Sequence, residues 1–365
     1  AGAASHKAAT AALASQRRSF TPRRDDIGVP PCPAKPAESA QAPPADDCPP
    51  QRRHWVQPTA EAPRAEAPRA QATPAPAPIR NAGCGEGNRK PELLSLDELQ
   101  FGKVLGSGGF GAVYRGMFRG QEVAIKKLHM VDGQVSPMQL DEFRKEVANL
   151  QALRHQRLVS LVGAAYSAPS LCIVTEFMPN GSLYEFLHQR KEVIASSQRF
   201  VMVRQIAEGV DFLHGQTPPF VHRDLKSMNV VLDFELNVKL CDFGLTQSME
   251  KTHISRRDNE GGSPRYMAPE LFDCRGRITE KVDIWALGCL ALEVITGRMP
   301  HEECTSIQQV MTKTLVDHKC PFRDLEGLGL SAELHSLAER CFDFQPKSRI
   351  DAKRFLERLA LVHLP

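Results

Sequence analysis

One short stretch of the sequence concentrates residues suited to phosphate chemistry. The run from His222 to Asn229 reads His-Arg-Asp-Leu-Lys-Ser-Met-Asn, and an Asp-Phe-Gly tripeptide begins thirteen residues later at Asp242. It supplies a candidate base, Asp224, a candidate phosphate-binding cation, Lys226, and two candidate Mg²⁺ ligands, Asn229 and Asp242. Phosphoryl transfer depends mainly on positioning the reactants and neutralising their charge, so these residue types at this spacing suit it.

A glycine-rich turn upstream could approach phosphate groups closely. Its sequence matches the pattern G-x-G-x-x-G over Gly106, Ser107, Gly108, Gly109, Phe110 and Gly111. Glycines permit a close backbone approach, but they also form ordinary hairpins, so the pattern alone is weak evidence. A dinucleotide-binding fold would need a helix to begin at the last glycine. A strand-like run follows instead, which disfavours that fold.

Lys126 and Glu146 form a candidate ion pair beneath this turn. Lys126 ends the strand-like run Val-Ala-Ile-Lys, fifteen residues after Gly111. Glu146 shares one face of a helical pattern with Phe143 and Leu150, where an acidic side chain needs a specific partner. Glu142 is the competing candidate, but it lies off that face.

The pattern of apolar residues predicts a small β-rich lobe joined to a larger helical lobe, an α+β fold. Three antiparallel strands are expected between residues 99 and 127, a helix over 137–153, a strand over 171–176 and a turn at 179–181. Helices dominate afterwards, over 182–189, 199–214, 281–296, 307–315 and 332–341.

The first quarter of the chain differs in composition from the rest. Residues 1–92 hold sixteen of the 27 prolines and few large apolar residues, and residues 61–70 repeat Glu-Ala-Pro-Arg-Ala. Such a segment cannot bury enough apolar surface to offset the entropy of ordering it, so we expect a disordered Pro/Ala-rich tail. Its Pro-x-x-Pro spacings at residues 30–36 could dock a proline-reading domain.

Charge, cysteines and hydropathy exclude several classes of protein. A formal net charge of +3 gives no strong nucleic-acid footprint. None of the ten cysteines forms a Cys-x-x-Cys pair, so the sequence signals neither a zinc site nor a redox motif and suits a cytoplasmic protein, or a nuclear one. The longest apolar stretch, residues 284–295, is too short to span a membrane and reads as a core helix. The chain begins at alanine rather than methionine, so what precedes residue 1 is undefined.

Taken together, these motifs resemble a eukaryotic protein kinase domain. The glycine loop, Val-Ala-Ile-Lys, His-Arg-Asp-Leu-Lys-x-x-Asn, Asp-Phe-Gly and the Ala-Pro-Glu at 268–270 occur in that family's order. The likeness runs from about residue 97 to 361, within a domain expected over 93–365. It is greatest to the tyrosine-kinase-like group of serine/threonine kinases, near Raf and mixed-lineage kinases, on the phrases at 155–163 and 261–267.

The resemblance implies a role for each motif. ATP would bind between a small lobe (about 97–176) and a large lobe (about 182–361) joined by a hinge (about 176–181), with Mg²⁺, or Mn²⁺ as the alternative ion. Asp224 and Lys226 would act on the hydroxyl and the γ-phosphate, Lys126 paired with Glu146 on the α- and β-phosphates, and Asn229 and Asp242 on the metal. The remaining nucleotide contacts would come from the glycine loop and from Val113, Ala124, Thr175, Glu176 and Met178. Glu270 and Arg349 would form a structural ion pair.

Three further expectations concern substrate and regulation. Lys226, together with Ser263 as a hydrogen-bond partner for Lys226 and Asp224, favours serine and threonine substrates over tyrosine. A dual-specificity or tyrosine kinase, or a pseudokinase scaffold, is the alternative. Arg223 could pair with a phosphate that an upstream kinase places on Thr252 or Ser255. Cys241 reads as an inert core residue, with alkylation by ATP-site electrophiles as the sharper hypothesis.

Overall fold

The computed structural model describes residues 92–108, 111–128, 135–166, 170–250, 254, 262–272, 277–322 and 325–362. The tail predicted over 1–92 therefore lies outside the described residues except for Glu92, as do Gly109, Phe110, Thr252 and Ser255. The chain divides into two compact units, Ala1–Ala82 and Gly83–Pro365, and every described residue belongs to the second.

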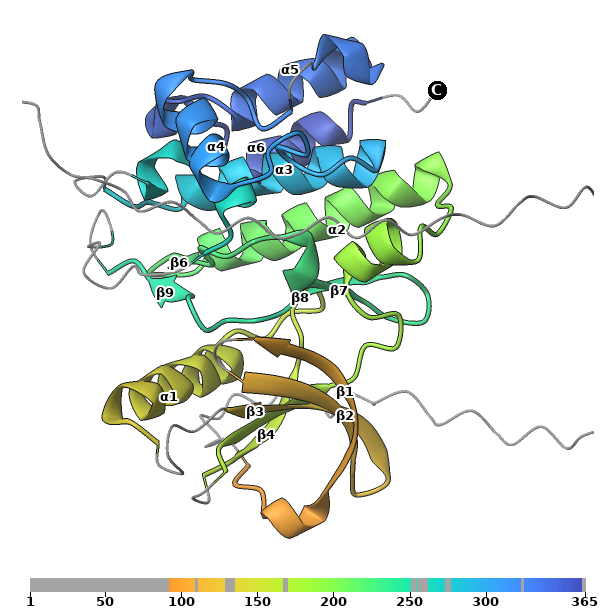
Figure 1. Ribbon diagram of the computed structural model, residues 1–365, viewed down its shortest axis with the longest axis vertical. Coiled ribbons are helices and arrows are strands. Elements are labelled where there is room, and N and C mark those ends of the chain that lie inside the picture. The colour runs from red at the N-terminus through yellow and green to blue at the C-terminus, as the bar shows by residue number, and fades with distance from the viewer. Residues whose placement is uncertain are drawn as a thin grey trace, which may run out of the picture. The chain divides into compact units, whose positions relative to one another are not determined.

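The strands and helices of this second unit form two lobes, a small one built on a sheet and a larger one that is mainly helical (Figure 1). The small lobe contains strands β1 (Leu99–Gly108), β2 (Gly111–Phe118), β3 (Gln121–Leu128), β4 (Leu161–Ala165) and β5 (Cys172–Glu176), with helix α1 (Pro137–Ala152). The large lobe contains α2 (Ser196–His214), α3 (Lys281–Thr296), α4 (Ile307–Met311), α5 (Ala332–Cys341) and α6 (Ala352–Leu359). It also holds the short strands β6 (Phe220–Val221), β7 (Val230–Leu232), β8 (Val238–Leu240) and β9 (Gln247–Ser248).

The small-lobe sheet has the antiparallel order β1-β2-β3-β5-β4, and its alternating faces decide where Lys126 lies. Successive side chains on a strand point to opposite faces. Val123 and Ile125 of β3 are fully buried in a core cluster on one face, which they share with residues such as Leu99 and Phe118. Lys126 must therefore project from the other face. The three-stranded start expected from the sequence is confirmed.

Helix α1 begins with a complete capping box, which explains why the helix starts directly after Ser136. Ser136 Oγ accepts a bond from the amide of Gln139 at 3.2 Å, and Gln139 Oε1 accepts one from the amide of Ser136 at 3.0 Å. Pro137 occupies the first turn, where its missing N–H costs nothing. The buried face of α1 consists of Phe143, Glu146, Val147 and Leu150, the spacing of one helical stripe.

Helix α3 forms the centre of the large lobe. Nearly all its residues are buried, including Asp283 and Glu293. Gly288 lets α5 approach closely, since a Cβ there would lie 2.6 Å from Cys341 Cβ. One continuous core cluster contains apolar residues of α1, apolar residues of α3 and the side chain of Phe243, so the two lobes share a core.

Several elements differ from the sequence prediction, which did not include the short strands β6 to β9 or helix α6. The helix expected over 182–189 is a π-helical segment at Glu185–Gln189, and the one expected over 307–315 changes from α4 to a π-helical segment at Thr312–Val316. Strand β4 was not predicted, because Leu-Val-Gly-Ala-Ala has little strand propensity and is fixed by pairing with β5. None of the described helices combines the length and apolarity needed to cross a membrane.

Candidate active site

A cavity of about 600 Å³ lies between the two lobes. That volume suits a ligand the size of a nucleotide. Ten of the residues predicted to bind nucleotide, metal or phosphate line it, from both lobes: Gly106, Val113, Ala124, Lys126, Glu146, Thr175, Glu176, Met178, Asn229 and Asp242. The structure thus brings residues separated by more than a hundred positions to one cleft.

The glycine turn is only partly represented on the wall of this cavity. Gly106 lines it, whereas Ser107 and Gly111 belong to the paired ends of β1 and β2 and are not among its lining residues. At Gly111 a Cβ would lie 2.3 Å from the carbonyl oxygen of Lys127, so glycine is required for β2 to pair with β3 at that point. The turn's glycines therefore also serve strand packing.

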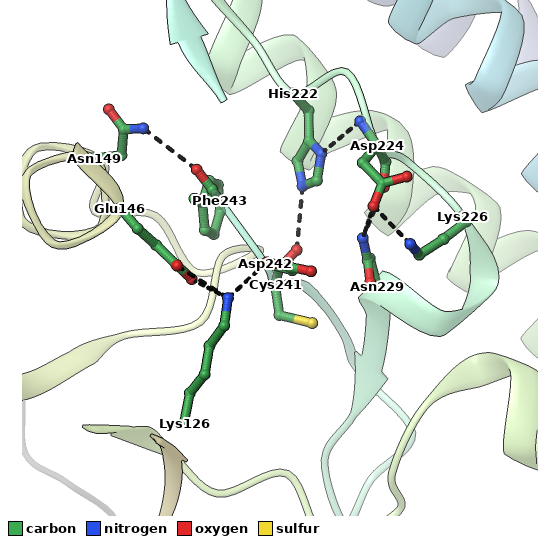
Figure 2. A network of polar contacts seen from close by, with 10 residues as sticks. All are labelled: Lys126, Glu146, Asn149, His222, Asp224, Lys226, Asn229, Cys241, Asp242 and Phe243. Atoms are coloured by element: carbon green, nitrogen blue, oxygen red, sulfur yellow. Dashed lines mark hydrogen bonds and ion pairs between the residues drawn. The ribbon is translucent and has the colours of Figure 1, made fainter. Parts of the chain in front are cut away.

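Lys126, which lines the cavity, is held by two carboxylates (Figure 2). Its Nζ donates to Glu146 Oε1 at 2.7 Å, to Glu146 Oε2 at 2.9 Å and to Asp242 Oδ1 at 3.0 Å. Burial opposes the charge on Lys126, but the two carboxylates outweigh it and raise its pKa. Burial raises the pKa of Glu146, while at Asp242 the attraction of Lys126 outweighs burial and lowers the pKa. Among the described residues, Glu146 and Asp242 are the hydrogen-bond partners of Lys126 Nζ, and the alternative partner Glu142 is not one of them.

Asp242 begins the segment that ties α1 to the large lobe. Its backbone adopts a left-handed conformation (φ 63°), which is uncommon for a residue with a side chain. The next residue, Phe243, is 1% exposed, and its ring lies 5.4 Å from that of His222. Phe243 and Leu150 of α1 both lie in the shared core.

Asn149 fixes the backbone on the other side of Phe243. Its Nδ2 donates to the carbonyl of Thr246 at 2.9 Å and to that of Phe243 at 3.4 Å, and Figure 2 shows it pointing from α1 toward Phe243. Sequence reasoning missed this residue. Its position three after Glu146 on the same helix was the available signal, since both side chains must face the same way.

We expect Asn149→Ala to lower kcat/KM for phosphoryl transfer about fivefold, the equivalent of roughly 1 kcal/mol for one lost hydrogen bond. Without the bond, the segment from Phe243 to Thr246 is held less firmly beneath α1. Steady-state kinetics beside Lys145→Ala, an exposed position on the same helix, would check this. Equal effects of the two substitutions would contradict a positioning role for Asn149.

The carboxylate of Asp224 is held by three neighbouring side chains. Lys226 Nζ donates to Oδ2 at 2.6 Å, Asn229 Nδ2 to the same oxygen at 3.1 Å, and Ser263 Oγ to Oδ1 at 3.1 Å. Asn229 Nδ2 also donates to the backbone carbonyl of Asp224 at 2.8 Å, which leaves the amide oxygen of Asn229 as its metal-binding atom. The predicted contact of Ser263 with Asp224 is present, whereas its contact with Lys226 is not described.

Asp283 of α3 anchors the loop that carries Asp224. Its Oδ2 accepts a hydrogen bond from the backbone amide of His222 at 2.8 Å, and its Oδ1 one from that of Arg223 at 2.9 Å. His214 Nε2 lies 3.0 Å from Oδ2. Burial alone would raise the pKa of Asp283, but the hydrogen bond and charge of His214 lead the interactions that lower it. The anchor was not predicted, because no local pattern joins residues sixty positions apart.

Arg223, the predicted regulatory cation, already has contacts in this structure. Its backbone is left-handed (φ 67°), and its Nε donates to the carbonyl of Leu245 at 2.5 Å. Because Thr252 and Ser255 lie outside the described residues, their relation to Arg223 stays a prediction.

The hinge has backbone groups that could hydrogen-bond the adenine base of a nucleotide. The backbone amide of Glu176 donates to the carbonyl of Ser160 at 3.0 Å. The carboxylate of Glu176 accepts hydrogen bonds from the amide of Ser160 and from Lys239 Nζ, both at 2.7 Å. This leaves the carbonyl of Glu176, to which Thr175 Oγ1 donates at a long 3.4 Å, and the amide of Met178 as candidates for adenine recognition. The Glu176 side chain has a structural role instead.

Cys241 lines the cavity, but its environment disfavours alkylation. Burial and then the charge of Asp242 raise the pKa of its thiol to about 12. We expect a reaction with iodoacetamide at pH 7.5 roughly 10³-fold slower than that of a free thiol of pKa ~8.5, because the thiolate is the reactive form. The rate should rise about tenfold per pH unit as the thiolate fraction grows. Peptide mapping by mass spectrometry measures it; a fast, ATP-protectable adduct at pH 7.5 would support the electrophile hypothesis instead.

Comparison with known proteins agrees with this geometry. Residues 99–359 match the family model of protein tyrosine and serine/threonine kinases. A probable serine/threonine-protein kinase of Dictyostelium discoideum is 37% identical over 256 residues, which cover 70% of this chain and 27% of that protein. The dual specificity protein kinase shkC of the same organism is 33% identical, covering 74% and 52%. Serine/threonine-protein kinase CTR1 of Arabidopsis thaliana is 33% identical, covering 72% and 32%.

The chain thus spans between about a quarter and about half the length of these relatives. The matched segment contains both lobes, the cavity between them and every residue that holds Asp224, Lys126 or Asp242. The chain belongs to the family of protein tyrosine and serine/threonine kinases.

Proposed function

We propose that this chain is an ATP-dependent protein kinase that transfers the γ-phosphoryl group to serine or threonine hydroxyls of protein substrates. One observation carries the proposal: Lys126, which binds Glu146 and Asp242, lines the same cavity as Asn229, and Asn229 and Lys226 both donate to the carboxylate of Asp224. A phosphate-binding cation and two candidate metal ligands thus face one cavity, and Asn229 joins that cavity to the candidate base Asp224 beside it.

Asp224 is the residue we assign to the substrate hydroxyl. Its carboxylate orients the hydroxyl oxygen toward the γ-phosphorus and accepts the proton as the new O–P bond forms. Lys226, within 2.6 Å of that carboxylate, would stabilise negative charge on the transferred group. Hydrogen bonds from Asn229 and Ser263 fix the plane of the carboxylate, which keeps the base aligned.

The donor set fits a magnesium ion. The carboxylate of Asp242 and the amide oxygen of Asn229 are the oxygen ligands that Mg²⁺ prefers, and both residues line the cavity. The ion would neutralise charge between the phosphate groups when bound. Lys126 would hold the α- and β-phosphates, and Glu146 keeps its ammonium in place.

Two contacts favour serine and threonine over tyrosine. Ser263 lies against Asp224, and Lys226 extends beside the same carboxylate, so the space at the base suits a short hydroxyl side chain. Two of the relatives are named serine/threonine kinases, and one is named a dual specificity kinase. Dual specificity is therefore the second candidate. A pseudokinase scaffold is disfavoured because the residues assigned to catalysis are all present.

Incubation of the purified chain with Mg-ATP and a generic protein substrate tests the proposal. Phosphoamino-acid analysis should find phosphoserine and phosphothreonine, and Asp242→Ala should abolish transfer. Phosphotyrosine beside them would establish dual specificity. No transfer by the wild-type chain, tested with and without an activating upstream kinase, would favour the scaffold.

The same proposal includes the setting of the protein. The six cysteines among the described residues are free, which suits a reducing compartment, so we place the protein in the cytoplasm or nucleus. An upstream kinase acting on the segment that follows Asp242, and a proline-reading domain bound to the tail, are its proposed regulatory partners.

A further inference from the structure

The loop between α3 and α4 gathers three metal-ligating side chains outside the kinase site. The imidazole of His301, the carboxylate of Glu303 and the thiol of Cys304 have ligand atoms within 4.8 Å of one another. His301 is 1% exposed and Cys304 2% exposed. A histidine, a cysteine and an acidic residue are the donor types that Zn²⁺ takes.

A second observation is the unsatisfied imidazole of His301. Its Nδ1 is buried and makes no hydrogen bond to any part of the chain that the structure describes. Buried polar atoms nearly always have a partner, so an exception needs an explanation.

The loop is held in shape without the metal. Arg265 Nη2 donates to the carbonyl of Cys304 at 2.7 Å, the amide of Cys304 to the carbonyl of His301 at 2.9 Å, and the amide of His301 to that of Pro321 at 2.6 Å. The backbone of His301 is left-handed (φ 50°). Ligands about 2.0–2.3 Å from one Zn²⁺ lie roughly 3.5 Å apart, so side-chain rotations would suffice to close the site.

A cation already lies against two of these ligands. Lys313 Nζ pairs with the carboxylate of Glu303 and contacts the thiol of Cys304. The pocket therefore attracts positive charge, and the ammonium would have to move away for a dication to enter. The side chain of Lys313 is 30% exposed, so it can turn toward solvent.

We propose that His301, Glu303 and Cys304 form a site for a transition-metal dication, with Zn²⁺ as the best-suited ion and water as the fourth ligand. Cys304 loses its proton to solvent when it binds the metal. The site was not predicted, because its ligands do not follow the Cys-x-x-Cys spacing that signals a zinc site. The loop leads into Thr305, Ser306 and Ile307, which with Lys226 and Ser263 line a second cavity of about 390 Å³. Metal binding would thus stiffen one wall of a groove beside the catalytic base.

Cobalt binding to the full chain tests the proposal without using kinase activity. Titration with Co²⁺ should produce a thiolate-to-cobalt charge-transfer band, and Zn²⁺ should abolish it. Cys304→Ser should remove the band, whereas Cys320→Ser, at a nearby half-buried cysteine, should keep it. A band that survives Cys304→Ser, or no band in the wild-type chain, would overturn the proposal.

Two adjacent glutamates and one lysine supply matched variants. Glu303→Gln should weaken Co²⁺ binding by tenfold or more, and Glu302→Gln, whose carboxylate pairs with Arg298, should leave it unchanged. Lys313→Met should strengthen binding roughly 10–100-fold, since the competing ammonium is gone. Misfolding cannot produce such a gain. Equal effects at the two glutamates, or no gain from Lys313→Met, would refute the assignment.

Discussion

Asp224→Asn is expected to lower kcat by roughly 10²–10⁴-fold, the usual contribution of a positioned general base. The amide that replaces the carboxylate cannot accept the proton of the substrate hydroxyl. It has nearly the same shape, so the surrounding side chains Lys226, Asn229 and Ser263 stay in place. The loop itself is fixed by backbone bonds to Asp283, which the substitution does not touch.

Pre-steady-state transfer and nucleotide affinity, measured on the same preparation, check this prediction. The dissociation constant for Mg-ATP should change less than about threefold, which is under ~1 kcal/mol, because Asp224 does not line the nucleotide cavity. A variant that keeps wild-type kcat would show that Asp224 is not the base. A large loss of nucleotide affinity would place Asp224 in binding instead.

Arg349→Met is expected to lower the free energy of unfolding by about 3–5 kcal/mol, the cost of breaking a buried ion pair. The Arg349 side chain is 0% exposed and donates to Glu270 Oε1 at 2.6 Å and Oε2 at 2.8 Å. It also donates to the carbonyls of Asp343 at 2.7 Å and Lys281 at 2.9 Å, and lies over the ring of Trp285. The substitution therefore removes the hydrogen-bond donor of a buried carboxylate and of two backbone carbonyls at once.

Denaturant unfolding followed by circular dichroism measures the loss. The double variant Arg349→Met/Glu270→Met should be less destabilised than Arg349→Met alone, since no buried charge is then left without a partner. Arg115→Ala breaks an exposed pair with Glu122 and should cost less than about 1 kcal/mol. A similar cost for Arg115→Ala and Arg349→Met would refute the distinction between the two pairs.

The contacts and elements that could be anticipated from the sequence are those with a local signal. Glu146 could be assigned as the partner of Lys126 because it shares a helical face with Phe143 and Leu150, and the structure brings the two charges together. The strands β1 to β3 and the helices α3 and α5 followed from periodicity in the same way.

The residues that escaped prediction act across long sequence separations. Asn149 binds a backbone carbonyl 97 positions away. Tyr266 donates to Glu293 at 2.9 Å, and His188 Nε2 lies 2.7 Å from the other oxygen of that carboxylate. No sequence spacing predicts the two contacts of Glu293, since the tertiary fold alone decides which elements meet. Strand β4 was missed for the same reason, because its partner β5 supplies the stability that its own residues lack.

Because the His222–Asn229 loop is attached to Asp283, the candidate base and the phosphate-binding lysine belong to different lobes. The base and its neighbours are attached to α3 of the large lobe, while Lys126 and Glu146 belong to β3 and α1 of the small lobe. Domain opening would break the contact between Lys126 and Asp242 and the bonds from Asn149 to the segment after Asp242, while the Lys126–Glu146 pair and the bonds to Asp224 would stay intact. Nucleotide exchange and catalytic alignment would then be two positions of one hinge, and product release would require no local unfolding.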